Sequence, residues 1–383
     1  MRAELHLDSS PIWGKGSASM PGLLLGGDVM LARGVGKILD SRGLATPFSR
    51  ELGDHFPKDV GICNLEATIS ALGAPSSAAR SPFRASPGCE LLLRDAGIRI
   101  AGLANNHILD YGVSAALDTI DRLVAVGITP IGAGRCAEEA RQPAIVEFGE
   151  SSRAGVLAYS ALATGKPARG NRGFAIAPAR LEWMADDVER LSRRVDAVIV
   201  SVHWGYEGVE YPMPESRSIA RSLEAAGATI VFGHHPHVVQ GIETLERGVA
   251  AYSLGDWVFD RLTDERRRAI LLRVLPDGGS RCRIQPIPIW RTDNLESVPA
   301  KPNPGNQILK DISDLSSLFD SGESDGMFWR SAGAAFLHDQ RTGWRDALRK
   351  EGLRAIVSRL QRFRLRHLRL MWNSLRDLRR REP

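Results

Sequence analysis

The sequence predicts a protein of the α/β class, and two observations favour it. Short runs of aliphatic and β-branched residues alternate with segments of helical periodicity between residues 22 and 275. Polar clusters that contain Asp, Glu, Asn or His follow several of these runs directly. Because strands that alternate with helices tend to run parallel and end at one edge of a sheet, these clusters are expected on loops along that edge.

Three strands are expected in the first part of the chain. They lie within 22–31, 59–66 and 98–104, and each stops at polar residues. A helix over 114–126 is expected next, with its first residue, a serine, as N-cap and a glycine just after its end. The alternation then continues, with one more helix over 215–226. The further strand-like runs are 154–162, 196–202, 229–232, 249–254 and 269–275.

Composition divides the chain into four segments. Residues 1–21 are polar and rich in Gly and Ser and are expected to be flexible, whereas 22–290 form the α/β body. Residues 291–343, rich in Asp, Ser, Pro and Asn, are expected to form a linker that wraps the surface or is partly flexible. Residues 344–383 have helical periodicity with arginines between the apolar positions.

Two features favour a cytoplasmic protein, either free or peripheral to a membrane. No run reaches the ~18 to 20 apolar residues of a transmembrane helix, and the N-terminus lacks the apolar stretch of a signal peptide. The four cysteines, at 63, 89, 136 and 282, are far apart and form no CxxC pair, which fits a reducing compartment.

The positive charge of the chain is concentrated at its C-terminal end. Residues 341–383 carry 14 Arg and Lys against 4 Asp and Glu, whereas the preceding 340 residues carry 36 against 41. A basic amphipathic helix of this kind lies on an anionic membrane surface, binds an anionic polymer, or packs on the body with a solvated arginine face. We favour the first or the last. Nucleic acid is not expected as a partner, because no aromatic-rich binding module accompanies the charge.

Histidine placement is the most informative feature. Five of the nine histidines fall in three short clusters, each just after an expected strand. The polar groups at strand ends are Asp28, Asn64-Leu65-Glu66, Asn105-Asn106-His107, His203-Trp204-Gly205 and Gly233-His234-His235-Pro236-His237. Imidazole nitrogens with carboxylate and amide oxygens suit one or two divalent ions such as Mn, Fe or Zn better than Ca. The sequence therefore predicts a metal site built from five loops.

Each cluster taken alone has another explanation. Asp28 after two glycines is typical of a turn, Glu66 of a helix cap, and His107 of a hydrogen-bonded structural histidine. The Gly-His-His-Pro-His run is a stronger signal, because three histidines in four residues are costly to bury without a ligand, although a surface turn would also explain it. Their joint occurrence favours the metal site.

The motifs resemble those of a known family. In chain order they are Gly27-Asp28-Val29-Met30, Asn64-Leu65-Glu66, Ala104-Asn105-Asn106-His107-Ile108-Leu109-Asp110-Tyr111-Gly112, His203-Trp204-Gly205, Gly233-His234-His235-Pro236-His237-Val238 and Tyr252-Ser253-Leu254-Gly255. They resemble the successive signatures of the CapA (PgsA) family of capsule, or poly-γ-glutamate, synthesis proteins in the calcineurin-like metallophosphoesterase superfamily. The resemblance covers about residues 22–260 and implies a four-layer αββα sandwich, here with a helical C-terminal extension.

The resemblance also implies roles for individual residues. The implied metal ligands are Asp28, Glu66, Asn106, His203, His234, His235 and His237. Of the last three, only two would ligate, and we favour His234 with His237. His107 would act as the acid near the leaving group, with Asp110 of the same motif beside it.

Substrate contacts are expected from residues beside the ligands. Asn64 and Asn105 flank them in the sequence, and Trp204 and Glu207 would shape the mouth of the site. Trp204 is equally explained as a residue packed over the sheet edge. Arg33, just after the first motif, would either meet an anionic substrate or be a solvated loop residue, and we favour the second.

Three positions depart from the superfamily pattern. Met30 stands where phosphoesterases have the histidine of Asp-x-His, so the first metal site would lack one ligand. Glu66 stands where they have an Asp-containing loop. Asp256 stands where the family usually has Asn, and it would tighten metal binding or accept a backbone hydrogen bond.

The leading hypothesis is a metal-dependent hydrolase or transferase that acts on an anionic phosphoester or polyglutamate-related substrate in capsule or anionic-polymer biosynthesis. The alternative is a non-catalytic polymer-binding or membrane-associated assembly component of a capsule system. The missing histidine and the basic tail would favour this alternative. Metal content and turnover separate the two.

Overall fold

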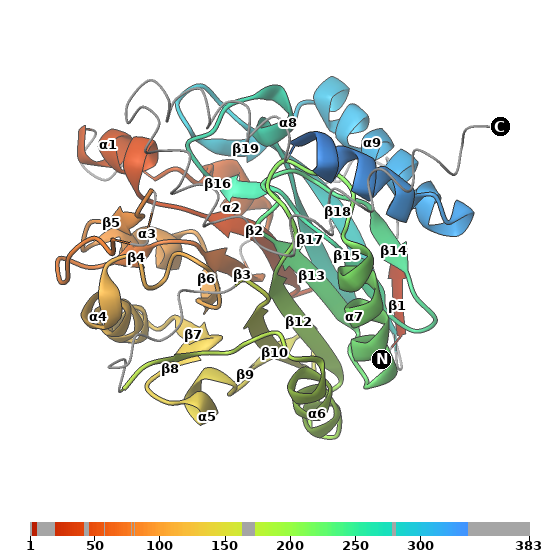
Figure 1. Cartoon of the computed structure of the whole chain (residues 1–383), viewed down its shortest axis with the longest axis horizontal. Helices are drawn as coiled ribbons and strands as arrows, with labels where there is room; N and C mark the ends of the chain where they lie inside the picture. Colours follow the sequence, from red (N-terminus) through yellow and green to blue (C-terminus); the bar gives the residue numbers. More distant parts are fainter. Residues whose placement is uncertain are drawn as a thin grey trace, which may run out of the picture.

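The computed structural model describes residues 2–5, 20–41, 46–56, 58–77, 79, 81–162, 173–277 and 281–335. In this part of the chain two β-sheets face each other, and helices cover the outer side of each (Figure 1). The α/β class and the αββα order of layers are therefore confirmed. The basic helical tail expected over 344–383 lies outside the described residues.

The first sheet is mixed and has nine strands among the described residues. In spatial order its main path is β1 (Arg2–Leu5), β18 (Arg281–Arg291), β17 (Arg268–Pro276), β2 (Leu23–Val29), β3 (Val60–Leu65), β6 (Ile98–Gly102) and β7 (Thr129–Ile131). The short strands β16 (Asp256–Val258) and β19 (Ser297–Pro299) pair with β2 and β18. Strands β2, β3, β6 and β7 run parallel, so their carboxyl ends meet at one edge.

The second sheet has six strands within the same described ranges. Their order is β14 (Ile242–Thr244), β15 (Val249–Ala251), β13 (Ile230–His234), β12 (Ala197–His203), β10 (Ser152–Ser160) and β9 (Ala144–Phe148). Strands β10, β12, β13 and β15 are parallel. Two small two-stranded sheets join β11 (Ala175–Ile176) to β8 (Ala133–Gly134) and β4 (Thr68–Ile69) to β5 (Arg84–Ala85).

Side chains alternate between two apolar layers along the central strands. In β2, Leu23 and Leu25 point into the core between the sheets, whereas Leu24 points to the helices outside. In β12, Ile199 joins the central core and Val200 the outer one. Strands buried on both faces read as continuous apolar runs, which is why these segments could be recognised in the sequence. Fully burying one such side chain stabilises the fold by about 1.5–3 kcal/mol.

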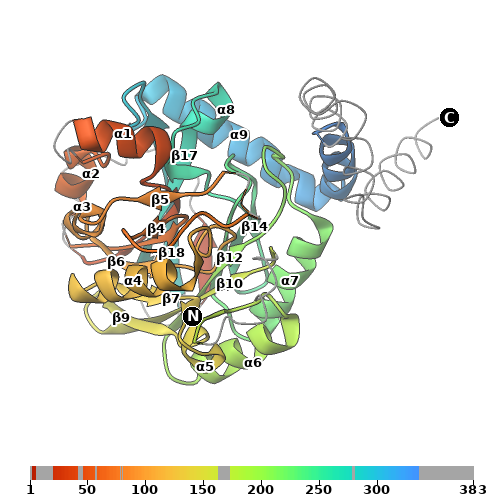
Figure 2. The same cartoon turned by 60° about the vertical axis from the view of Figure 1, so that its left-hand side comes forward.

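The helices divide between the two outer faces. Helices α1 (Arg33–Ser41), α2 (Arg50–His55), α3 (Cys89–Asp95) and α4 (Gly112–Ala125) cover the first sheet. Helices α6 (Leu181–Ser192) and α7 (Pro214–Ala225) cover the second, on the opposite side of the molecule (Figures 1 and 2). The remaining labelled helices are α5 (Ala137–Ala140), α8 (Asp264–Arg267) and α9 (Pro302–Ser321). No helix in the described residues is long and apolar enough to cross a membrane.

The structure corrects two expectations about the ends of the body. Residues 2–5, expected to be flexible, form β1 and pair in parallel with β18. The segment expected as an irregular linker contains β19 and the long helix α9, followed by a helical stretch over 324–335. Its polar composition concealed the four-residue spacing of Ile308 and Ile312, which α9 buries.

One further boundary differs from expectation. Helix α4 begins at Gly112, and its N-cap residue is Tyr111, which makes no side-chain cap hydrogen bond. Ser114 therefore lies inside the first turn instead of capping it. Capping by serine is a preference of isolated helix ends, and here the preceding loop fixes where the helix starts.

Two glycines allow the strand ends of the sheets to approach one another. A Cβ at Gly27 would lie 1.9 Å from the carbonyl oxygen of Gly255, and a Cβ at Gly233 would lie 1.9 Å from that of Tyr252. Such contacts are far inside van der Waals distance, so only glycine fits at either position. Gly27 precedes the candidate ligand Asp28, and Gly233 precedes the histidine run. The glycines therefore set the close packing on which the site depends.

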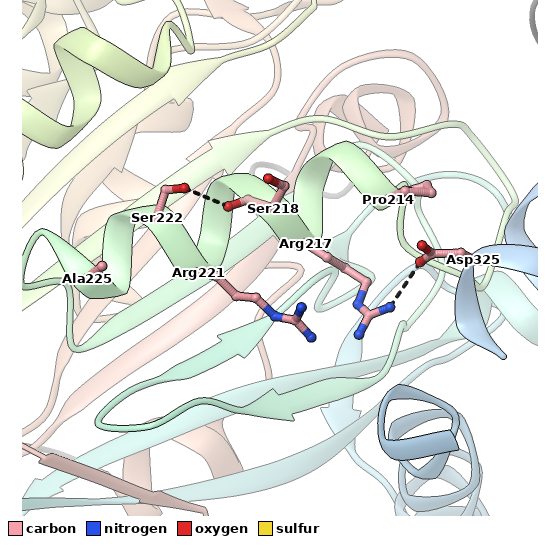
Figure 3. A pocket seen from close by; sticks show the side chains of 7 residues that line it. All are labelled: Pro214, Arg217, Ser218, Arg221, Ser222, Ala225 and Asp325. Atoms are coloured by element: carbon pink, nitrogen blue, oxygen red, sulfur yellow. Dashed lines mark hydrogen bonds and ion pairs between the residues drawn. The ribbon is translucent and has the colours of Figure 1, made fainter. Parts of the chain in front are cut away.

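A cluster of charged side chains joins α7 to the helical stretch over 324–335. A shallow pocket of about 370 Å³ is lined by α7 and Asp325 (Figure 3). Arg217 Nη1 donates to Asp325 Oδ1 at 2.9 Å, and Arg217 Nη2 lies 3.3 Å from Glu243 Oε1. Arg221 and Tyr252 also donate to Glu243. This carboxylate is therefore the common acceptor of three donors.

The pH dependence of stability should report on Glu243. Burial would raise its pKa, but the hydrogen bonds from Tyr252 and Arg217 lower it below the usual 4.5. The stability from this carboxylate is therefore fully present above about pH 4.5 and is lost as the pH falls through the lower pKa of the folded state. The melting temperature of the Glu243→Gln variant should consequently fall less steeply than that of the wild type below this pH.

Thermal melts between pH 3 and pH 7 check this expectation. Glu189→Gln is the matched control, because Glu189 pairs with Arg193 on the exposed face of α6. The melting temperature of Glu189→Gln should change with pH in parallel with that of the wild type. Parallel curves for Glu243→Gln would contradict the prediction.

Candidate metal centre

The strand ends of the two sheets bring the predicted ligand residues into one place. Asp28 lies in β2, and Glu66 follows β3 directly. His203 and His234 end the adjacent parallel strands β12 and β13 and occupy paired register positions. The Nδ1 of His234 lies 3.1 Å from Oδ1 of Asp28, so the contact crosses from one sheet to the other.

Three groups of buried side chains in the described residues could hold a metal ion, because their ligand atoms lie within 4.8 Å of one another. The groups are Glu66 with His235 and His237, Asp28 with His237 and Asp256, and Asp28 with Glu66 and His203. They share members and therefore form one continuous centre. His237 belongs to two of them, whereas the favoured partner His234 belongs to none. The distances thus group His235 with His237.

Glu66 lies at the middle of this centre. Its Oε1 is 3.6 Å from Nε2 of His107, 3.9 Å from Nε2 of His203 and 3.8 Å from Nε2 of His237. These separations are too long for hydrogen bonds, and in the part of the chain that the structure describes neither carboxylate oxygen has a hydrogen-bond partner, although both are buried. Burial, with the neighbouring charges of Asp28 and Asp256, raises the pKa of Glu66 well above its usual value.

Asp28 is the opposite kind of carboxylate, since donors surround it. Asn64 Nδ2 donates to its Oδ1 at 2.8 Å, and the main-chain N–H of His235 donates to its Oδ2 at 2.9 Å. Burial alone would raise its pKa, but His234, followed by His237 and His203, holds the pKa well below the usual range. Asp28 is therefore ionised at neutral pH.

The histidine run has an unusual backbone. His235 and His237 have φ angles of 94° and 57°, in the left-handed region that non-glycine residues rarely adopt. Burial, and then the charge of His237, lowers the pKa of His235 to about 4. Burial opposes protonation of His237 as well, but Asp256, whose Oδ1 lies 2.7 Å from its Nδ1, raises its pKa.

His107 is held from two sides. Its Nδ1 lies 2.6 Å from Oδ2 of Asp110, and its ring stacks on Phe83 with 3.8 Å between ring centroids. Asp110 also accepts the main-chain N–H of Phe83 at 2.8 Å. The side chain is 17% exposed, and its Nε2 lies 3.6 Å from Oε1 of Glu66. The structure thus places both residues of the predicted acid pair together.

The three asparagines differ in what they contact. Asn106 Oδ1 lies 2.7 Å from Nε2 of His203, inside the centre. Asn64 donates to Asp28 and lies 3.3 Å from Nδ1 of His203. Asn105 is fully buried, and its amide donates to Asn64 Oδ1 and to the carbonyl of Leu65. Asn64 and Asn105 therefore use their amides to fix the ligand loops.

One expected site residue, Trp204, lies elsewhere, and so does Met30, which stands in place of the superfamily's histidine. Trp204 is buried in the outer core, and its Nε1 donates to the carbonyl of Tyr252 at 3.0 Å, so it does not shape the mouth of the site. Met30 is buried in the core beneath the helices, where its Sδ accepts the main-chain N–H of Ala32. Glu207, by contrast, is 43% exposed and pairs with Arg261 at 2.6 Å.

Sequence reasoning missed the buried arginine that supports Asp256. Arg291, at the end of β18, is fully buried, and its Nη1 lies 3.1 Å from Oδ2 of Asp256. Asp256 pairs in register with Asp28 through β16 and β2. The carboxylate of Asp256 thus contacts both His237 and Arg291. Its role is therefore more than that of a backbone hydrogen-bond acceptor. An arginine directly after the apolar run 286–290 was the available signal, because such a residue, when buried, needs a partner.

A four-layer α/β protein with a buried carboxylate and histidine centre at its strand ends is the class that fold and site define. Within that class, the chain belongs to the bacterial capsule synthesis protein PGA_cap family, whose model matches residues 22–261. The family resemblance seen in the sequence motifs is therefore confirmed.

Two curated relatives show how far the similarity extends. The PGA biosynthesis protein CapA of Bacillus subtilis is 27% identical over 273 residues, which are 69% of this chain and 70% of that protein. The probable polyglutamine synthesis accessory protein of Mycobacterium tuberculosis is 30% identical over 325 residues, 72% of this chain and 86% of that protein.

Solved structures show a more distant likeness. The calcineurin-like phosphoesterase YfkN of Bacillus subtilis matches with a TM-score of 0.39 and 11% identity, over 78% of this chain and 97% of that one. The 5'-nucleotidase of Candida albicans matches with the same TM-score and 9% identity, over 68% of this chain. The chain spans about half the length of the Candida enzyme, 48%.

Proposed function

We propose that this protein is a metal-dependent hydrolase or transferase that acts on an anionic phosphoester or polyglutamate-related substrate in the synthesis of a capsule or another anionic polymer. The observation that carries the proposal is the buried, unpartnered carboxylate of Glu66 surrounded by histidines. The polymer is supported by the family and by the names of the curated relatives.

The side chains of the centre fit divalent cations. Within the described residues, both oxygens of Glu66, Nε2 of His234 and Nδ1 of His235 are buried without a hydrogen-bond partner. Such atoms are costly to bury unless a ligand satisfies them. The separations of 3.9 and 3.8 Å from Glu66 Oε1 to Nε2 of His203 and of His237 are compatible with two ligands on one ion, since each metal–ligand bond is about 2.0–2.2 Å long.

The protonation state of His203 also suits a cation. Burial, followed by the charge of His235, lowers the pKa of His203 well below its usual value, so this imidazole is neutral and able to coordinate. We assign Asp28, Glu66, His203, His235 and His237 as the ligands, with Asn106 beside them. A bound divalent ion would supply Lewis-acid polarisation and positive charge against an anionic reacting centre.

His107 is positioned to handle a proton. Because the carboxylate of Asp110 accepts the proton of Nδ1, Nε2 is the atom left to exchange a proton with a leaving group. Stacking on Phe83 prevents the ring from turning away. Together these contacts hold Nε2 of His107 3.6 Å from Glu66.

The second candidate function is a non-catalytic assembly component, and the position of Met30 favours it. The thioether faces the core, so no ligand replaces the expected histidine there. Such a protein would bind metal for structure and hold polymer without turning it over.

Elemental analysis and a substrate screen test the proposal together. The purified full chain is assayed for bound metal and for turnover of phosphomonoesters, phosphodiesters and γ-glutamyl oligomers. We expect at least one transition metal ion per chain and turnover that a chelator abolishes. Bound metal without turnover would support the assembly component, and protein without metal after reconstitution would contradict both the site and the reaction.

A further inference from the structure

Two arginines beside the metal centre are not used by the mechanism above. Arg261 and Arg266 lie in the segment that follows β16, and neither stood out in the sequence. The Nη1 atom of Arg266 is buried, yet within the described residues it has no hydrogen-bond partner. A Cβ at Gly208 would lie 3.3 Å from its Nη2, so this guanidinium lies over the loop that carries Glu207.

The environment of Arg266 is costly for the free protein. Burial, and then the nearby charge of Arg261, lowers the pKa of Arg266 below its usual value. A half-buried cation beside a like charge, with no carboxylate hydrogen-bonded to it among the described residues, destabilises the state that contains it. Such an arrangement is typical of a site whose anionic partner comes from outside the chain.

Arg261 connects this pair to the centre. Its guanidinium lies 5.9 Å from the ring centroid of Phe259, and that ring packs against His237 at 4.6 Å. Its Nη1 donates to Glu207 at 2.6 Å, and the two side chains are 32% and 43% exposed. Burial would raise the pKa of Glu207, but His237 and then Arg261 lower it to about 2, so this carboxylate is charged. Glu207 is thus an internal counter-ion for Arg261, exposed enough to be displaced.

Arg291 fixes the whole segment relative to the metal centre. Its Nη2 donates to the main-chain carbonyls of both Arg261, at 2.9 Å, and Arg266. Its Nη1 reaches Asp256, which contacts His237. One buried guanidinium therefore holds the two arginines at a fixed distance from the ligands.

We propose that Arg261 and Arg266 form a binding site for a second anionic group of the substrate, next to the group that reacts at the metal centre. The inference rests on the proposed function and adds that the substrate carries at least two anionic groups on one chain. Carboxylate and phosphate share this chemistry, since both accept the paired N–H donors of a guanidinium. Binding displaces Glu207 from Arg261 and supplies the missing acceptor of Arg266.

The decisive variant is Arg266→Gln, examined in the full-length, metal-loaded protein. The probe is a fluorescein-labelled γ-linked glutamate octamer, with binding followed by anisotropy. We expect roughly ten-fold weaker binding, together with an unchanged or higher melting temperature, because an unpaired cation has been removed from the free protein. Arg193→Gln, which makes the same charge change on the exposed face of α6, should alter neither quantity.

Glu207→Gln should change octamer binding in the direction opposite to Arg266→Gln. Removing the internal counter-ion should tighten octamer binding several-fold, a gain that a misfolded protein does not show. Competition with inorganic tripolyphosphate shows whether the site binds phosphate as well as carboxylate. If it does, tripolyphosphate should displace the octamer.

Several results would overturn the inference. One is a lower melting temperature of the Arg266→Gln variant. Another is that Arg266→Gln binds the octamer as tightly as Arg193→Gln does. A third is that the wild-type protein binds neither the octamer nor tripolyphosphate. These outcomes are separate from failure of the proposed function. Metal content and turnover of single-anion phosphoesters do not depend on the second site, so they would remain if only the arginine site were wrong.

Discussion

Replacing Glu66 with glutamine is expected to lower the affinity of the protein for divalent metal by at least about 100-fold, more than the loss of an outer-shell partner of a ligand. The same variant should raise the melting temperature of the chelator-treated protein. The carboxylate is buried among Asp28 and Asp256 without a hydrogen-bond partner, so its charge opposes folding when no cation is present. A neutral amide of the same shape removes that repulsion and also removes the ligand.

Equilibrium dialysis with elemental analysis measures the first effect, and melts in the presence of a chelator measure the second. Glu90→Gln is the matched control, since Glu90 is also a buried glutamate but accepts the N–H of Gly88 and pairs with Arg122. It should lose stability and keep its metal. Unchanged metal affinity in Glu66→Gln would show that this carboxylate is not a ligand.

Replacing His107 with glutamine is expected to lower turnover by about 10²- to 10⁴-fold, the usual contribution of a general acid. Metal content should stay at the wild-type level, because His107 belongs to none of the three ligand groups found in the described part of the chain. Its Nε2 is nevertheless 3.6 Å from Glu66, close enough to act on a group bound there. Loss of rate without loss of metal separates proton transfer from ligation.

The companion variant is Asp110→Asn. A neutral amide does not stabilise a protonated imidazole as a carboxylate does, and it can offer its own Nδ2–H to Nδ1, so turnover should fall. Steady-state rates of both variants, with metal content determined on the same samples, check the expectation. Full activity in His107→Gln would remove the residue from the mechanism.

The ligand loops could be predicted from the sequence because their information is local. Asp28 and Glu66 stand close to the ends of apolar runs, and parallel strands place such residues near one sheet edge. The histidines at 234, 235 and 237 follow another run in the same way. The meeting of the two sheets at this centre was harder to predict, since it depends on the segment 252–255, which joins β15 to β16 and packs against Gly27 and Gly233.

Other features depend on contacts that no local pattern records. Arg291 reaches Asp256 from a strand 35 positions further along the chain, and its role appears only when β18 and β16 lie in one sheet. Trp204 stands beside a ligand in the sequence, yet strand alternation turns it to the opposite face and into the core. Helix α9 has a polar composition overall, and its buried stripe is defined by the strands beneath it.

The most direct test of the account is the position of a bound metal in crystals of the full chain soaked with Mn²⁺. We expect the strongest anomalous difference peaks among Asp28, Glu66, His203 and His237, about 2.0–2.3 Å from carboxylate oxygens and imidazole nitrogens. A peak elsewhere on the chain, with none among these side chains at saturating metal, would contradict the assignment of the metal centre.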